Sequence, residues 1–120
     1  MATDTKMTGD FKDKPQTMSL AERVIRMVDS LGPSRKEVKG QMTFARKRKF
    51  LWMWTYGHTA DGTLYFTVCL DRAMESPHFH YVKQVSPNRW NHHVVIRSFE
   101  QIDSSWFREL VEAGYAFSGR

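Results

Sequence analysis

The chain has 120 residues, of which 18 are Lys or Arg and 13 are Asp or Glu, giving a formal net charge of +5. This length fits a single domain, and a hydrophobic fraction of 41% excludes a largely disordered or fibrous chain. The single cysteine, Cys69, excludes an intramolecular disulfide, and the uncharged runs are too short to cross a membrane. We therefore expect a cytoplasmic protein with no membrane segment.

Positive charge is concentrated in one segment of the chain. Residues 33–50 contain seven Lys and Arg against Glu37 alone, and they end in a basic tetrapeptide, Arg46, Lys47, Arg48 and Lys49. Residues 51–120 hold six basic and seven acidic side chains. A localised excess of this kind indicates a polyanionic partner. The alternative is a solvated turn whose cations keep the protein soluble.

The N-terminal part of the chain predicts an arm followed by a helix. Residues 1–17 are polar and lack periodicity, so we expect a flexible arm there and a single domain over residues 18–120. Apolar side chains at helical spacing predict a helix over residues 19–31. Ser19 and Glu22 match a capping box at its start, and Gly32 with the following proline would end it.

The middle of the chain is typical of β-structure. Strands are predicted over residues 42–45 and 50–56, which flank the basic tetrapeptide as a hairpin with a cationic tip, and over residues 63–70. Alternate positions of the second strand would share one face, and these carry Phe50, Trp52, Trp54 and Tyr56. Two further strands, over residues 79–85 and 91–97, flank a turn at residues 86–89.

The last predicted element is a helix over residues 104–117, with Asp103 as its N-cap. The order is thus a helix, five strands and a helix. This order predicts an α+β fold, in which both helices pack on one face of a mostly antiparallel sheet.

Candidates for metal binding and catalysis are few. His78, His80 and His93 are weak candidates for a transition-metal site: His78 and His80 share one strand face, and if Val85 pairs with Trp90, His93 lies opposite Val82 on that face. The alternative is scattered histidines that bridge the interior and water. Cys69 lies in an apolar strand as a packing residue, and the chain has neither a nucleophile elbow nor a phosphate-binding glycine loop. We expect no cofactor and no catalysis.

Basic residues interleaved with aromatic ones indicate nucleic acid. Cations neutralise phosphates, and flat rings can stack on unpaired bases. We therefore expect the basic hairpin to bind DNA or RNA with low sequence specificity. The predicted contacts are Arg46, Lys47, Arg48 and Lys49, with Lys39 and Arg89 in support.

The aromatic residues also allow other interpretations. The tryptophans could pack in the core, or an apolar pocket could bind a small molecule between Trp52, Trp54, Tyr56 and Trp90. A closed cavity beneath the aromatic face would favour the small molecule, and a filled core with a cationic outer hairpin would favour the polyanion. A third possibility is a protein-interaction module that uses an exposed strand edge. The sequence leaves the oligomeric state open.

Two stretches of the chain carry a family resemblance. The first runs from residues 22–24 through residues 31–33 and continues with residues 43–46 and Phe50. The second consists of residues 89–98, 102–103 and 110–115. In these the chain resembles, over residues 20–117, a small bacterial domain of unknown function that is often described as transport-associated.

A more distant resemblance concerns the final hairpin and helix, which are similar to those of the YjbR/MmcQ-like proteins. Those proteins have a double-wing α+β fold, and their wings are proposed to bind DNA. The resemblance implies that two hairpins, over residues 42–56 and 79–97, act as wings. It supplies no catalytic residue.

Overall fold

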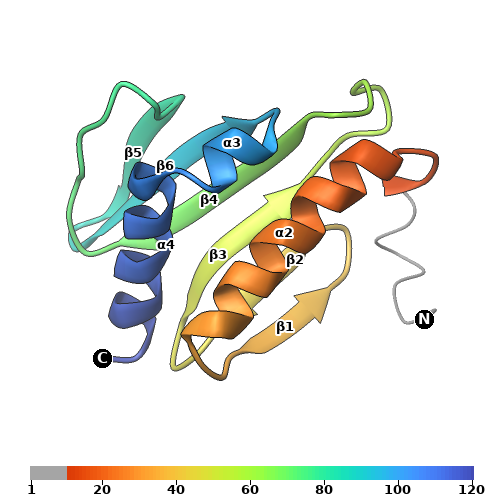
Figure 1. Ribbon diagram of the computed structural model, residues 1–120. Helices are drawn as coiled ribbons and strands as arrows, with labels where there is room; N and C mark the ends of the chain where they lie inside the picture. The colour runs from red at the N-terminus through yellow and green to blue at the C-terminus, as the bar shows by residue number, and fades with distance from the viewer. Residues whose placement is uncertain (1–10) are drawn as a thin grey trace.

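The computed structural model describes residues 11–120, which fold as one six-stranded sheet with helices on one side (Figure 1). All neighbouring strands are antiparallel, and their order across the sheet is β1-β2-β3-β4-β6-β5. The strands are β1 (Arg35–Val38), β2 (Met42–Ala45), β3 (Lys49–Trp54), β4 (Leu64–Leu70), β5 (Tyr81–Ser86) and β6 (Arg89–Ile96). The helices are α2 (Pro15–Leu31), α3 (Phe99–Ile102) and α4 (Ser105–Ser118).

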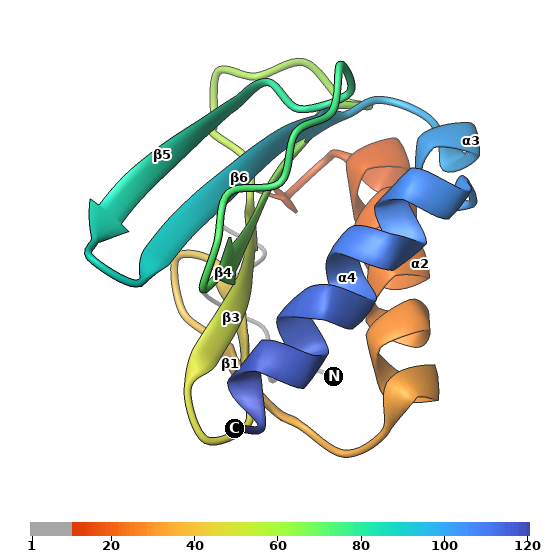
Figure 2. The ribbon, with the colours of Figure 1, turned by 90° about the vertical axis from the view of Figure 1, so that its left-hand side faces the viewer.

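The two long helices cover the same face of the sheet (Figure 2), which confirms the predicted α+β architecture. Strand β4 shows how the core is built. Leu64, Phe66, Val68 and Leu70 are fully buried on the helical side, and the Phe66 ring lies 4.7 Å from the ring of Phe107 in α4. The residues between them, Tyr65 among them, face the opposite side of the sheet, because side chains alternate along a strand.

The sheet has six strands where the sequence predicts five. The extra strand is β1, which pairs with β2 from Arg35 opposite Ala45 to Val38 opposite Met42. Its first three residues are exposed and charged, so no apolar alternation announces it. Charged side chains are a common protection of an edge strand against pairing with other molecules.

Helix α2 begins at Pro15 rather than at Ser19, so the predicted capping box is wrong. The cap comes from the loop between β3 and β4: the Asp61 carboxylate accepts hydrogen bonds from the backbone N–H groups of Thr17 (2.9 Å) and Gln16 (3.3 Å). These are among the four N–H groups that a helix start leaves unpaired. Burial opposes ionisation of Asp61, but these hydrogen bonds hold its pKa below the ordinary value.

Part of the predicted N-terminal arm is folded. Residues 15–17 form the first turn of α2, and Phe11 is buried against the core. Residues 1–10 of that arm lie outside the described residues. Within residues 11–120, no helix combines the length and the apolar character that a membrane crossing requires.

The C-terminal region contains a short helix that the sequence analysis did not predict. Ser98 and Gln101 form a capping box at the start of α3, and Asp103 ends that helix instead of capping α4. Helix α4 starts after Ser104. It lies close to the sheet at Gly114, where a Cβ atom would come within 2.6 Å of Val68 Cγ1 and 3.1 Å of Phe50 Cδ2.

Two strand details differ from the prediction and matter for the site. An irregularity between Phe44 and Ala45 shifts the β2–β3 register, and Phe50 packs edge-on against Tyr115 of α4 instead of joining the tryptophans. In the last hairpin Trp90 pairs with Gln84 rather than with Val85. As a result His93 lies opposite Tyr81 instead of Val82.

Candidate nucleic-acid interface

The two layers of the molecule carry opposite charge. Residues 32–98, which contain all six strands and their turns, hold 11 Lys and Arg against four Asp and Glu. The helical segments, residues 15–31 and 99–118, hold three against six. Positive charge is therefore concentrated in the strand layer.

Two members of the basic tetrapeptide are engaged by α4. Arg46 Nη1 donates a hydrogen bond to the Tyr115 carbonyl (2.9 Å), and its guanidinium carbon lies 4.0 Å from the centre of the Tyr115 ring. Arg48 donates to the carbonyls of Phe117 (3.3 Å) and Arg120 (3.1 Å). The last carbonyls of a helix lack intrahelical partners and carry partial negative charge, so the two arginines stabilise the end of α4.

The other two members, Lys47 and Lys49, are exposed. Lys49 Nζ lies 3.7 Å from a Glu37 carboxylate oxygen, and both side chains are more than half exposed, so this ion pair is weak. The predicted cationic tip is thus divided into two guanidiniums that bind the helix end and two ammonium groups that face solvent.

The two predicted supporting residues, Lys39 and Arg89, are both exposed. Lys39 lies in the turn between β1 and β2, where its N–H donates to the Gln41 carbonyl (3.0 Å). Arg89, the first residue of β6, lines a depression of about 540 Å³ with Arg48 and Arg120. Asp71 lines the same depression and forms an ion pair with Arg120.

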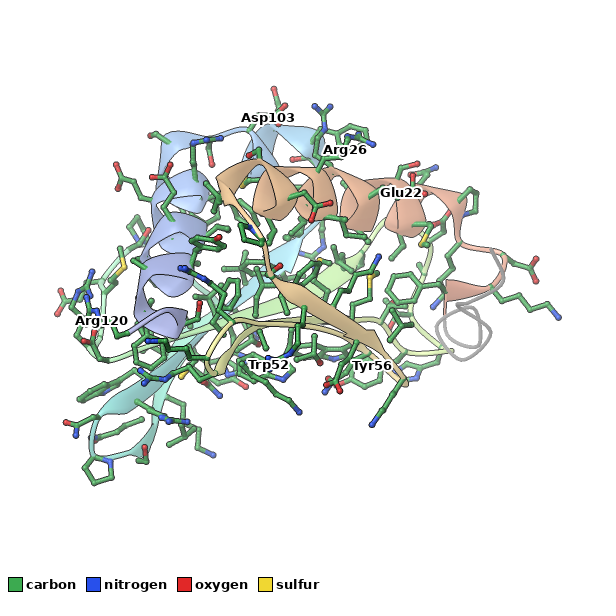
Figure 3. The ribbon with its side chains drawn as sticks, turned by 90° about the horizontal axis from the view of Figure 1, so that it is seen from below. Glu22, Arg26, Trp52, Tyr56, Asp103 and Arg120 are labelled. Atoms are coloured by element: carbon green, nitrogen blue, oxygen red, sulfur yellow. The ribbon has the colours of Figure 1, made fainter. Side chains whose placement is uncertain are left out.

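The face of the sheet opposite the helices carries aromatic rings from four strands; we call it the open face. Figure 3 shows Trp52 and Tyr56 on the side of the sheet away from α2. Trp52 and Trp54 are half-buried, and Tyr56 is 46% exposed. Register places rings of β4, β5 and β6 on the same face: Trp54 pairs with Tyr65, and the row from Trp52 continues through Thr67 to His93 and Tyr81.

These rings form two stacks. On β3 and β4, the rings of Trp54 and Tyr65 lie 5.9 Å apart at an interplanar angle of 21°. On β5 and β6, the rings of Tyr81 and His93 lie 4.2 Å apart at 23°. Between the stacks is a hollow of about 180 Å³, which is lined by both and which we call the ring slot. Tyr56 and His80 complete its walls.

A second hollow of about 220 Å³ shares Trp54 and His93 with the ring slot. Its other lining residues include Trp52 and two side-chain amides, those of Gln41 and Asn91. Neither hollow is lined by a Lys, Arg, Asp or Glu of the described residues. The open face therefore offers flat, uncharged walls with neutral hydrogen-bonding groups beside them.

His93 contributes a neutral ring to this face. Burial lowers its pKa, and the charges of His80, His92 and Lys83 lower it further, so the imidazole is uncharged at neutral pH. Its Nδ1 atom forms a 2.8 Å hydrogen bond with Thr67 Oγ1, which fixes the ring on the sheet.

The three histidines of the proposed metal site do not converge. His80 and His93 line the ring slot, but His78 stacks on Trp106 of α4, with 4.4 Å between the ring centres. Among residues 11–120 no group of three or more His, Cys, Asp or Glu side chains is arranged to hold a metal ion.

The four aromatic residues of the predicted ligand pocket are also separated. Trp52, Trp54 and Tyr56 share the open face, whereas Trp90 pairs with Leu70, which faces the helices, and lines a different depression with Met74 and Phe79. Sequence reasoning missed the contributions of Tyr65, Tyr81 and Asn91. The alternation of β4 already places Tyr65 on the outer face, but Tyr81 and Asn91 depend on the register of the last hairpin.

A family model described as a domain of unknown function, DUF5655, matches residues 7–118. The chain belongs to this family. The resemblance to a small domain of unknown function is thereby confirmed, whereas the likeness of this DUF5655 domain to the YjbR/MmcQ-like proteins and a link to transport stay predictions. Neither a curated protein nor a solved structure matches the chain.

Proposed function

We propose that this DUF5655 domain binds nucleic acid through its strand layer, with low sequence specificity. The observation that carries the proposal is the separation of charge, with 11 cations against four acids in the strand layer and three against six in the helices. A phosphate backbone is attracted to the first layer and repelled by the second, so the molecule has a preferred orientation on a polyanion.

The phosphate contacts we propose are five of the nine exposed Lys and Arg side chains of this layer. They are Lys39, Lys47, Lys49 and Arg89, to which we add Lys83 on the edge strand β5. Arg46 and Arg48 have a different role, because their guanidiniums hold the end of α4 and so fix the turn that presents the lysines. Contacts to phosphate carry no sequence information, which is the reason for expecting low specificity.

The test is the salt dependence of binding. Labelled oligonucleotides of mixed sequence are titrated with the protein at several KCl concentrations, and the dissociation constant is followed by fluorescence anisotropy. Each phosphate contact contributes about 0.7 to 0.9 to the slope of log affinity against log salt. The double variant Lys47→Ala/Lys49→Ala should therefore lower the slope by about 1.5 and weaken all sequences alike.

A matched control removes two exposed cations from the helical layer. Arg26 and Arg108 lie on α2 and α4, and the variant Arg26→Ala/Arg108→Ala changes net charge by the same amount as the lysine variant. We expect its salt slope to equal that of the unmodified protein. Equal losses in both double variants, or an affinity that ignores salt, would contradict the proposal.

A further inference from the structure

We infer that the bound nucleic acid is single-stranded, and that an unpaired base stacks in the ring slot between the Trp54–Tyr65 stack and the Tyr81–His93 stack. This inference rests on the proposed function and specifies which nucleic acid the strand layer takes. It assigns to Tyr65, Tyr81 and His93 a role in binding.

The geometry of the slot fits a stacked base. Two stacked ring pairs, one on β3 and β4 and the other on β5 and β6, line the same hollow of about 180 Å³. Tyr81 is 50% exposed and Tyr56 is 46% exposed, so both rings are accessible to a partner. A base that stacks on an aromatic side chain gains about 1 to 3 kcal/mol.

The described lining of the slot carries no formal charge. It consists of aromatic, imidazole and aliphatic groups, and burial keeps His93 neutral. A phosphate or a carboxylate gains no ion pair there, whereas a flat heterocycle finds aromatic side chains on both walls. The occupant is therefore expected to be the base and not the backbone of the nucleic acid.

Side-chain amides and cations lie around the rings. Gln41 and Asn91, in the adjoining hollow, offer the donors and acceptors that pair with the edges of unstacked bases. Lys83 lies opposite Asn91 in the β5–β6 ladder and is exposed, and Lys39 is two residues from Gln41. Cations thus flank the ring region from β5 and from the β1–β2 turn, where the phosphates of neighbouring nucleotides would pass.

A duplex does not satisfy this arrangement. Its bases are stacked and paired, so a base can enter the slot only after it has been extruded from the double helix, at a cost of a few kcal/mol. A single strand presents its bases without that cost. The slot therefore favours single strands, while the surrounding lysines bind either form.

The experiment compares one labelled sequence as a single strand and as a duplex at the same salt concentration. We expect the single strand to bind at least about fivefold more tightly, since one stacked base is worth about 1 to 3 kcal/mol. Tyr81→Ala should weaken single-strand binding by about five- to 100-fold and leave duplex binding and the salt slope unchanged. Tyr81→Phe should retain single-strand binding, because the ring remains.

The matched control is Phe99→Ala, which removes an exposed ring from the helical side, where Phe99 is 41% exposed. It should leave both affinities unchanged. Thermal melting followed by circular dichroism checks that the Tyr81 variants are folded, and Trp54→Ala provides a second probe from the opposite wall of the slot.

Four outcomes would overturn the inference. If duplex and single strand bind equally with a normal salt slope, or if Tyr81→Ala and Trp54→Ala bind single strands normally, the slot does not take a base, although nucleic-acid binding stands. If free adenosine binds as tightly as the oligonucleotide, the hollow is a small-molecule site. If neither nucleic acid binds in a salt-dependent manner, the proposed function fails as well.

Discussion

In strands β2 to β4 the two faces of the sheet use different aromatic residues. On the helical face the large fully buried side chains include Phe44, Phe50 and Phe66, which have no polar atom. On the open face the rings belong to Trp, Tyr and His, all of which carry a polar group at the ring edge and remain partly exposed. A phenylalanine is stable in a dry core, whereas a tyrosine or tryptophan keeps its polar atom in water. On β2, β3 and β4 the type of ring therefore distinguishes the packing face from the candidate binding face, whereas on β6 Trp90 and His92 share the helical face.

Neighbouring residues of β4 test this distinction with the largest expected effect. Phe66→Ala removes a fully buried ring that contacts Phe107, and we expect it to lower the free energy of unfolding by about 3 to 5 kcal/mol. Tyr65→Ala, one residue earlier on the open face, should cost less than about 1.5 kcal/mol, the upper value for an aromatic pair. Urea unfolding monitored by circular dichroism measures both values, and similar losses would mean that the open face belongs to the core.

The β2–β3 turn provides a similar contrast at smaller scale. Arg46→Ala removes a guanidinium that is hydrogen-bonded to the Tyr115 carbonyl and stacked on the Tyr115 ring, and the expected loss is about 1.5 to 3 kcal/mol. Lys47→Ala, next to it, should change stability by no more than about 0.5 kcal/mol. Chemical denaturation of both variants measures the two losses of stability. A destabilised Lys47 variant with a stable Arg46 variant would reverse the roles we assign.

The adjacent histidines of β6 give the smallest expected effect, a dependence of stability on pH. Burial lowers the pKa of His92, and the positive charge of Arg72 lowers it further against the opposing carbonyls of Val68 and Trp90. His92 Nδ1 lies 3.2 Å from the Val68 carbonyl, and Nε2 accepts the Met74 N–H at 2.9 Å, so the folded state requires the neutral ring.

The sign of the pH effect follows from this lowered pKa. The unfolded chain takes up a proton near pH 6.5, while the folded chain does so only at lower pH. Stability is therefore constant above about pH 6.5 and decreases as the pH falls below it. Urea unfolding between pH 7.5 and 5 measures the slope, and His92→Gln should reduce it. Stability that increases on acidification would show that His92 gains a proton on folding.

Much of the fold is predictable because it depends on local patterns. The alternation of β4 and the helical spacing of α4 identify both elements and their buried faces correctly. The start of α2 is not predictable in this way, because Asp61 caps it from 44 residues away along the chain. Strand β1 was missed because its exposed charged residues have no apolar pattern.

The candidate site likewise has parts that follow from local sequence patterns and parts that depend on tertiary contacts. The alternation of Phe50, Trp52, Trp54 and Tyr56 places the last three rings correctly on one face, and only Phe50 departs from it by packing on Tyr115. The opposite wall of the slot could not be predicted, because an irregularity in the β5–β6 ladder shifts Tyr81 opposite His93. The division of the basic tetrapeptide also depends on tertiary contacts, since only the folded chain brings the end of α4 within reach of Arg46 and Arg48.

The ladder between β4 and β6 has a consequence for selectivity. Seven residue pairs join these strands, from Leu64 opposite Ile96 to Leu70 opposite Trp90, and each wall of the ring slot has one ring on this ladder, Tyr65 on β4 and His93 on β6. Changing the gap between the walls would require bending this central ladder, so the aperture is set before any guest arrives. A preorganised aperture loses little entropy on binding and discriminates by thickness. If the slot binds a base as we propose, we expect it to favour planar guests over puckered or branched ones of similar polarity.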